Sequence, residues 1–300
     1  MNSNRKAPPP CTICNLNKNV IRRGFFTRKS DRKRIQLYKC KKCKKCFSDQ
    51  TFSFDYHLKK RYLNQEVFRL LCKGNSQRGI AFLLDVKAEA IALRIKKFAK
   101  LAKKHLKKTR EKEDLSEVFF DEMESFEHTK CKPVTMPIAV NPKNRKILSV
   151  SAGKIAAKGI LAEISIKKYG PRQCERKAKL SNMLTELKDS HSGEITFSTD
   201  QSPHYPPALK KIFDKYRHIS YKGKRGCVVG QGELKAAGRD PLFSLNHTYA
   251  MIRDNIKRLS RRTWCTTKRI DMLENILYVY AYFHNQLMDK IRPRLVNLGF

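Results

Sequence analysis

The stretch Val118-Phe-Phe-Asp121 is a short apolar run that ends on a carboxylate. The stretch Glu194-Ile-Thr-Phe-Ser-Thr-Asp200 ends in the same way 79 residues later. Aromatic and β-branched residues in runs of this length predict strands, so we expect two strands that each end on an aspartate. If the strands are neighbours, the two carboxylates can share divalent cations, and their hard oxygen atoms suit Mg²⁺ or Mn²⁺. If they are not, each aspartate only caps a loop.

The sequence around these two stretches predicts an α/β domain over residues 114–300. Strand-like runs come first and helical patterns are interleaved afterwards, which is typical of an α/β or α+β catalytic domain. Besides the two runs above, we expect strands at 134–140 and 147–152, and helices at 178–188, 207–216, 246–259 and 272–287.

A metal site built on Asp121 and Asp200 needs a third ligand. The candidates are side chains with an oxygen atom in the last third of the chain: Glu233, Asp240, Asn246 and Asp254. Asn246 opens a predicted amphipathic helix, and Arg253 lies two turns further along the same face. Basic residues with little accompanying acid extend this helix, and we expect them to contact a phosphate backbone rather than only solvent. They include Lys257, Arg258 and Arg261.

Composition narrows the class of partner. The 300 residues carry 65 Lys and Arg against 27 Asp and Glu, a net charge of +38, and 40% of the residues are hydrophobic. Such a chain has enough apolar residues for about two folding units. So large a positive charge indicates a polyanionic partner, and nucleic acid is the first candidate. Residues 1–112 hold 32 of the basic residues but only 7 of the acidic ones, so the electrostatic footprint is concentrated there.

Cysteine spacing predicts a zinc ribbon in residues 1–56. Two Cys-x-x-Cys pairs, Cys11 with Cys14 and Cys40 with Cys43, match a closed tetrahedral zinc site. Cys46 has the same spacing from Cys43 and offers an alternative pair, while reactive or incidental thiols are the other reading. The loop between the pairs is basic, and we expect it to contact phosphate. Its cations are Arg22, Arg23, Arg28, Lys29, Arg32, Lys33 and Arg34.

Helical periodicity in residues 57–113 predicts a helix-turn-helix followed by a basic linker. Gly74 fits the end of one helix, Ser76 fits the N-cap of a second over about 77–85, and a third begins near Ala88. In a helix-turn-helix the last of these helices enters the major groove of DNA. We expect Arg78, Arg94 and Lys97 to contact DNA; the alternative is a plain packing hairpin. Residues 96–112 are expected to form a solvated basic helix or linker.

Residues 1–10 lack an apolar run, and the longest later one, 276–283, is too short and too polar to span a bilayer. No membrane partner is therefore expected, and we expect a soluble, intracellular protein.

Several motifs together resemble one family. They are the Cys-x-x-Cys pairs, the stretch 38–48, the helix-turn-helix, Phe120-Asp-Glu-Met-Glu-Ser-Phe126, Ser198-Thr-Asp-Gln201, Leu245-Asn-His-Thr-Tyr-Ala-Met-Ile-Arg253 and Lys257-Arg-Leu-Ser-Arg-Arg-Thr263. In order and spacing, this set resembles bacterial insertion-sequence transposases of the DDE class, of the type of the first-numbered insertion element.

The resemblance implies a ribonuclease-H-like domain whose first two catalytic acids fall on Asp121 and Asp200. The third acidic position falls on Asn246, where Glu would be expected, and the following basic position falls on Arg253. An amide oxygen can still ligate Mg²⁺, but the site loses a negative charge, and Glu233 is a possible substitute. Departures of this kind also fit a decayed copy that binds DNA without cutting it.

The sequence thus leads to one expected function and two rivals. We expect a DNA transposase that binds the inverted-repeat ends of its element as double-stranded DNA, cuts them with Mg²⁺ or Mn²⁺ and joins them to target DNA. A homo-oligomer on DNA and a bacterial cytoplasmic, nucleoid-associated location would follow. The rivals are a non-catalytic zinc and helix-turn-helix regulator, and a nuclease of repair or RNA processing.

Overall fold

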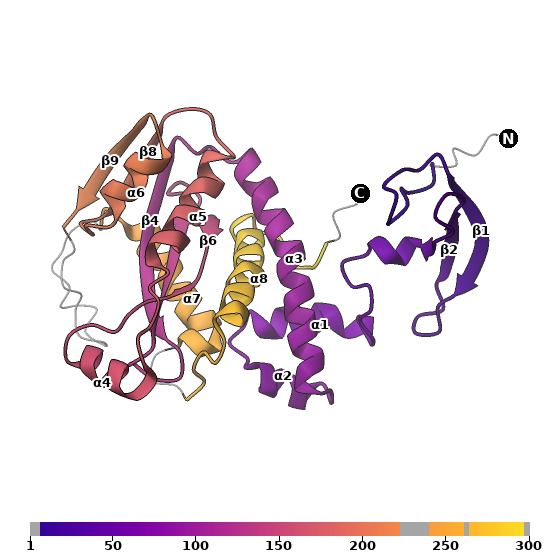
Figure 1. Cartoon of the computed structure of the whole chain (residues 1–300), viewed down its shortest axis with the longest axis horizontal. Coiled ribbons are helices and arrows are strands. Elements are labelled where there is room, and N and C mark those ends of the chain that lie inside the picture. The colour runs from indigo at the N-terminus through magenta and orange to yellow at the C-terminus, as the bar shows by residue number, and fades with distance from the viewer. Residues whose placement is uncertain (1–6, 223–239, 261–263, 297–300) are drawn as a thin grey trace. The chain divides into compact units, whose positions relative to one another are not determined.

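The computed structural model describes residues 7–222, 240–260 and 264–296 and divides into two compact units (Figure 1). The first unit comprises the chain up to Asn64 together with Val296, and the second runs from Gln65 to Leu295. The expected zinc-ribbon segment, 1–56, lies inside the first unit. That unit extends further because Arg61 pairs with Asp55 at 3.3 Å. Within the described residues, no helix combines the length and apolar character needed to cross a membrane.

The first unit is a three-stranded antiparallel sheet in the order β1-β2-β3. The strands are β1 (Val20–Thr27), β2 (Arg34–Cys40) and β3 (Cys46–Ser48), and short 3₁₀ helices follow at Asp49–Phe52 and Arg61–Leu63. Its core is small: Val20, Tyr38 and Phe47 pack with Cys11 and Cys40. Because so few apolar side chains are buried, a bound metal would contribute much of the stability of this unit.

The second unit contains a mixed sheet in the order β6-β5-β4-β8-β9, with β7 paired to β5. β4 (Glu117–Phe126), β5 (Pro133–Val140) and β6 (Ile147–Val150) are antiparallel, and β7 is Gly153–Lys154. β8 (Ile195–Asp200) pairs in parallel with β4, and β9 (Tyr216–Tyr221) in parallel with β8. The predicted α/β class is confirmed.

Four helices pack with this sheet: α5 (Arg176–Lys188), α6 (Tyr205–Ile212), α7 (Phe243–Asn255) and α8 (Ile270–Met288). A further helix, α4 (Ile160–Tyr169), is largely exposed. α5 and α6 bury Leu180, Leu184 and Leu209 against Val118 and Phe120 of β4. α8 is buried along most of its length. The side-chain amide of Asn285 in α8 exchanges two hydrogen bonds of 2.8 Å with the backbone of Ile147, which satisfies part of the edge strand β6.

The three helices before the sheet are α1 (Asn64–Leu71), α2 (Gln77–Leu83) and α3 (Ala88–Lys112). The side chain of Ser76 accepts a hydrogen bond from the Gly79 N–H, as expected of the N-cap, and Gly74 has φ +77°. α3 lies alongside α8 (Figure 1). The expected boundary near residue 114 falls between α3 and β4. From Gln65 onward, however, α1, α2 and α3 belong to the same compact unit as the sheet.

Local structure differs from the expectations in four places. β4 does not end at Asp121 but continues to Phe126, so this aspartate lies within the strand. Residues 96–112 form a helix, which was one of the two alternatives, but this helix is not solvated all round: it continues α3 and buries Phe98, Leu101 and Leu106. Because lysines dominate the composition of this stretch, its apolar residues do not stand out as a buried helix face in the sequence. The helix expected at 207–216 ends at Ile212, and 216–221 forms the polar edge strand β9. α4 was not predicted, because its apolar residues are exposed and give no helical stripe.

Candidate functional site

Four cysteines of the first unit converge. Cys11 and Cys14 precede β1, Cys40 ends β2, and Cys43 lies in the turn that follows. Their sulfur atoms all lie within 4.8 Å of one another, and those of Cys11 and Cys43 are 3.4 Å apart. Zn–S bonds of about 2.3 Å in a tetrahedron place the sulfur atoms about 3.8 Å apart. The cluster could therefore hold a metal ion such as zinc.

Backbone hydrogen bonds favour the thiolate form of Cys11. The N–H groups of Cys14 and Ile13 hydrogen-bond to the sulfur of Cys11 and lower its pKa to about 6, and the thiolate is the form that binds metal. Cys46 is exposed and lies outside the cluster, and its sulfur accepts a hydrogen bond from Arg23 at 3.3 Å. The choice of Cys43 over Cys46 is confirmed.

Asp121 and Asp200 lie level with each other on adjacent parallel strands. In the register of β4 and β8, Val118 is opposite Phe197 and Phe119 is opposite Ser198. Continued by two residues, this register brings Asp121 opposite Asp200. Both residues are half-buried. The condition for a shared cation site, that the two strands are neighbours, is therefore met.

The surroundings of Asp121 hold its carboxylate in place. The Tyr205 hydroxyl of α6 donates to Oδ1 of Asp121 at 2.7 Å, and the Glu122 N–H donates to the same oxygen at 2.6 Å. The pKa of Asp121 is raised to about 6. Burial is the largest cause and the charge of Asp200 adds to the rise, whereas the hydrogen bond from Tyr205 opposes it. The charge of Asp200 thus acts on Asp121, and a bound cation would relieve this repulsion.

α7 brings Asn246 to the same region. Tyr249, one turn after Asn246, donates its hydroxyl hydrogen bond to the backbone oxygen of Asp121, so α7 packs on β4 at this aspartate. Asn246 is exposed, and its Nδ2 donates to Oδ2 of Asp240 at 2.8 Å. The charge of Arg253 lowers the pKa of Tyr249, against a larger rise caused by burial. One face of α7 thus carries Asn246, Tyr249 and Arg253.

A third carboxylate does not join the pair in the described part of the chain. Among those residues, the cysteine cluster is the only group of three or more His, Cys, Asp or Glu side chains close enough to hold one ion. Glu122 is occupied by Arg176 at 2.6 Å and Thr135 at 2.8 Å. Asp254 is exposed, and Glu233 lies outside the described residues. The amide of Asn246 remains the candidate third ligand.

Sequence reasoning missed the two tyrosines. No spacing rule links Tyr205 or Tyr249 to a strand 84 or 128 residues away. The one available signal is that Tyr249 follows Asn246 by three residues, which places both on the same face of a helix.

The structure places the predicted DNA-contacting cations differently. Arg78 is exposed on α2, and Lys97 is half-buried on α3. The basic stripe expected to continue α7 is wrong, because α7 ends at Asn255 and Ile256 is extended. Lys257 is exposed in a 3₁₀ turn, and burial lowers the pKa of half-buried Arg258. Arg261 lies outside the described residues.

The expectation that Arg94 contacts DNA does not agree with its position in the structure. Only 3% of its surface is exposed, and its Nη1 donates to the backbone oxygen of Ala90 at 3.0 Å. It lies on the side of α3 that also buries Ile91 and Ile95. Arg94 therefore supports the packing of the helices and does not present its charge to DNA.

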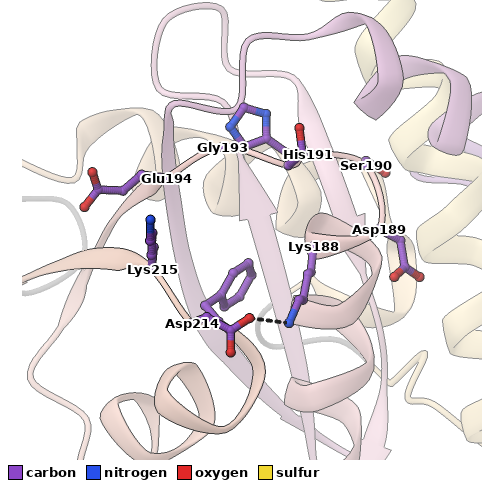
Figure 2. Close-up of a pocket in the computed structure, with 10 residues that line it drawn as sticks. Lys188, Asp189, Ser190, His191, Gly193, Glu194, Asp214 and Lys215 are labelled. Atoms are coloured by element: carbon purple, nitrogen blue, oxygen red, sulfur yellow. Dashed lines mark hydrogen bonds and ion pairs between the residues drawn. The ribbon is translucent and has the colours of Figure 1, made fainter.

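A pocket of about 720 Å³ lies at the opposite end of the sheet from the aspartates. Figure 2 shows its charged lining from the end of α5 and the starts of β8 and β9, with Lys188 paired to Asp214 at 3.3 Å. Glu194 lines it just before β8, whereas Asp200 ends that strand, and six residues of strand span about 20 Å. This pocket therefore does not contain Asp121 and Asp200.

No protein-family model matches the chain, and no curated protein sequence matches it.

Proposed function

We propose that this protein is a DNA transposase of the DDE class and that residues 114–300 form a ribonuclease-H-like catalytic domain. The observation that carries the proposal is the level placement of Asp121 and Asp200 on adjacent parallel strands. A sheet of three antiparallel strands continued by two parallel ones agrees with such a domain. The net charge of +38 agrees with a DNA substrate.

The donor atoms at this site suit a hard divalent cation. Burial and the charge of Asp200 raise the pKa of Asp121, and a bound Mg²⁺ or Mn²⁺ offsets this cost of ionising its carboxyl group. When bound, such ions stabilise the attacking and leaving oxygens of a phosphodiester. Tyr205 and the Glu122 N–H fix Oδ1 of Asp121, and the Ser202 N–H fixes Oδ1 of Asp200 at 3.0 Å. The remaining oxygens are thereby oriented in advance.

Asn246 and Arg253 complete the proposed site. Because the amide nitrogen of Asn246 donates to Asp240, the amide oxygen is left for a cation. Arg253 lies two turns along α7 and supplies a positive charge that can hold a phosphate of the DNA.

The proposed DNA contacts lie outside the acidic pair. The zinc-bearing first unit and α2–α3 would bind the inverted-repeat ends of the element as double-stranded DNA. Strand transfer requires two ends to meet, so we expect at least a homodimer on DNA, in the bacterial cytoplasm with the nucleoid.

The test is strand cleavage on a plasmid that carries the DNA flanking this coding region. With Mg²⁺ or Mn²⁺, we expect nicks at the ends of the flanking inverted repeats. Asp121→Asn and Asp200→Asn should each abolish nicking while binding of the same DNA persists. Asp189→Asn is the matched control, because it removes an exposed carboxylate at the opposite end of the sheet. Equal cleavage by the wild type and both site variants would refute the proposal.

A second candidate is a DNA-binding regulator that does not cut. It is favoured by the absence of a third carboxylate beside Asp121 and Asp200 in the described residues. Specific binding without cleavage by the wild type under either metal would support it. Cleavage without strand transfer or preference for the ends would instead indicate a nuclease.

A further inference from the structure

The first turns of α3 divide into a buried and an exposed face. Ile91, Arg94 and Ile95 are buried. The exposed side chains follow a spacing of four, three and four residues, which places them in one stripe along the helix. They are Glu89, Leu93, Lys96 and Lys100, and Leu93 is 44% exposed.

The connection to α2 holds this stripe in a fixed orientation. Asp85 adopts the left-handed conformation, with φ +48°, in the turn between the helices. The side-chain amide of Gln77, at the start of α2, donates to the backbone oxygen of Ala88 at 2.8 Å. Ile80 and Ala81 of α2 are buried, as is Ile91 of α3. The exposed stripe is therefore presented on a rigid pair of helices, as a base-reading element requires.

The charges on this face indicate how it would meet a duplex. Arg78, Lys87, Lys96 and Lys100 are exposed around it, which complements the phosphates of DNA. Glu89 would repel a phosphate, and Leu93 has no favourable contact with one. In a major groove, however, a carboxylate accepts a hydrogen bond from the cytosine amino group, and an apolar side chain contacts the thymine methyl group.

We propose that Glu89 and Leu93 read base edges in the major groove of double-stranded DNA and that Lys96 and Lys100 hold the neighbouring phosphates. The proposal rests on the proposed function in that it supplies the sequence preference for the element ends. In this proposal the DNA contact that was expected of Arg94, which is buried, is made instead by two residues that carry no positive charge.

The experiment selects binding sites for the full-length protein from a library of randomised duplexes. We expect Glu89→Ala to lose preference for cytosine at one position by roughly five- to 150-fold, without weakening binding to unrelated duplex. Replacing single thymines of the selected site by deoxyuracil removes one methyl group at a time. At one position this should weaken binding of the wild type but leave Leu93→Ala unaffected. Lys96→Ala should weaken binding to all sequences alike and lower the salt dependence by about one ion.

Two controls and three outcomes decide the matter. Glu111→Ala removes an exposed acid from the last turn of α3, and Ile166→Ala removes an exposed apolar side chain from α4; neither should change the selected site. If Glu89→Ala and Leu93→Ala both select the same site as the wild type, this proposal is refuted but the proposed function is not. The proposal is also refuted if Glu89→Ala lowers only the thermal stability, because an acid in the first turn also stabilises a helix. Failure of the wild type to select any sequence refutes end recognition in the proposed function as well.

Discussion

Tyr205→Phe removes one hydroxyl group from the side of Asp121 and leaves the surrounding packing intact. Tyr205 is 1% exposed, and its ring packs on Phe120 with a centroid distance of 4.9 Å, so phenylalanine leaves no cavity. The hydroxyl donates to Asp121 Oδ1 at 2.7 Å and accepts from the Glu122 N–H at 3.1 Å. That N–H keeps its 2.6 Å bond to Asp121, so the variant leaves no buried donor unpaired.

The expected loss depends on the charge of Asp121. A hydrogen bond to a charged group is worth about 1.5–3 kcal/mol and a neutral one about 0.5–1.5 kcal/mol. The pKa of Asp121 is about 6, so at about pH 8 the variant loses the charged bond and at about pH 4.5 the neutral one. Because the lost bond favours the ionised carboxylate, the pKa of Asp121 also rises further.

Urea unfolding at both pH values, without added Mg²⁺ or Mn²⁺, measures the two losses, and carbon NMR of the carboxyl group measures the pKa. Tyr249→Phe is the matched control. Its hydroxyl binds the neutral backbone oxygen of the same aspartate, so its loss should not change with pH. Equal losses for Tyr205→Phe at the two pH values, or an unchanged pKa of Asp121, would show that this tyrosine does not hold the ionised carboxylate.

Three further predictions concern stability. Chelation of the metal, or Cys11→Ser, should open residues 7–64 to protease without opening 65–295, because a structural zinc site contributes about 10–16 kcal/mol; Cys46→Ser should have no such effect. Burial lowers the pKa of His284 to about 4, so between about pH 6.5 and 4 the unfolded chain binds a proton that the folded chain does not. The free energy of unfolding should therefore fall by up to about 3 kcal/mol as the pH decreases through this range. Urea titrations of His284→Gln should show a weaker dependence on pH. Arg110 is buried between the Leu148 carbonyl and Glu186, both at 3.0 Å, so Arg110→Ala should lower unfolding free energy by about 3–5 kcal/mol; a calorimetric loss below 1 kcal/mol would contradict this.

Local signals were read correctly where one short segment decides the outcome. Ser76 caps α2 because its side chain reaches an N–H three residues away. The strand at 195–200 has the predicted bounds, because a short run of β-branched and aromatic residues fits a buried strand. The reading failed for α4 and β9, where exposed or polar residues hide the period, and for α3, where lysines outnumber the apolar residues that pack inside.

The sequence by itself determined the cysteine spacing, the positive charge and the strand that ends on Asp200, since each depends on residues a few positions apart. Only the tertiary structure decided that Asp121 and Asp200 lie level, because register between strands 79 residues apart is set by the packing of the whole sheet. It also turned Arg94 inward, left Glu89 and Leu93 outside, and brought two tyrosines to one aspartate. Which face of a helix or strand is buried depends on what packs against it, and that partner is encoded elsewhere in the chain.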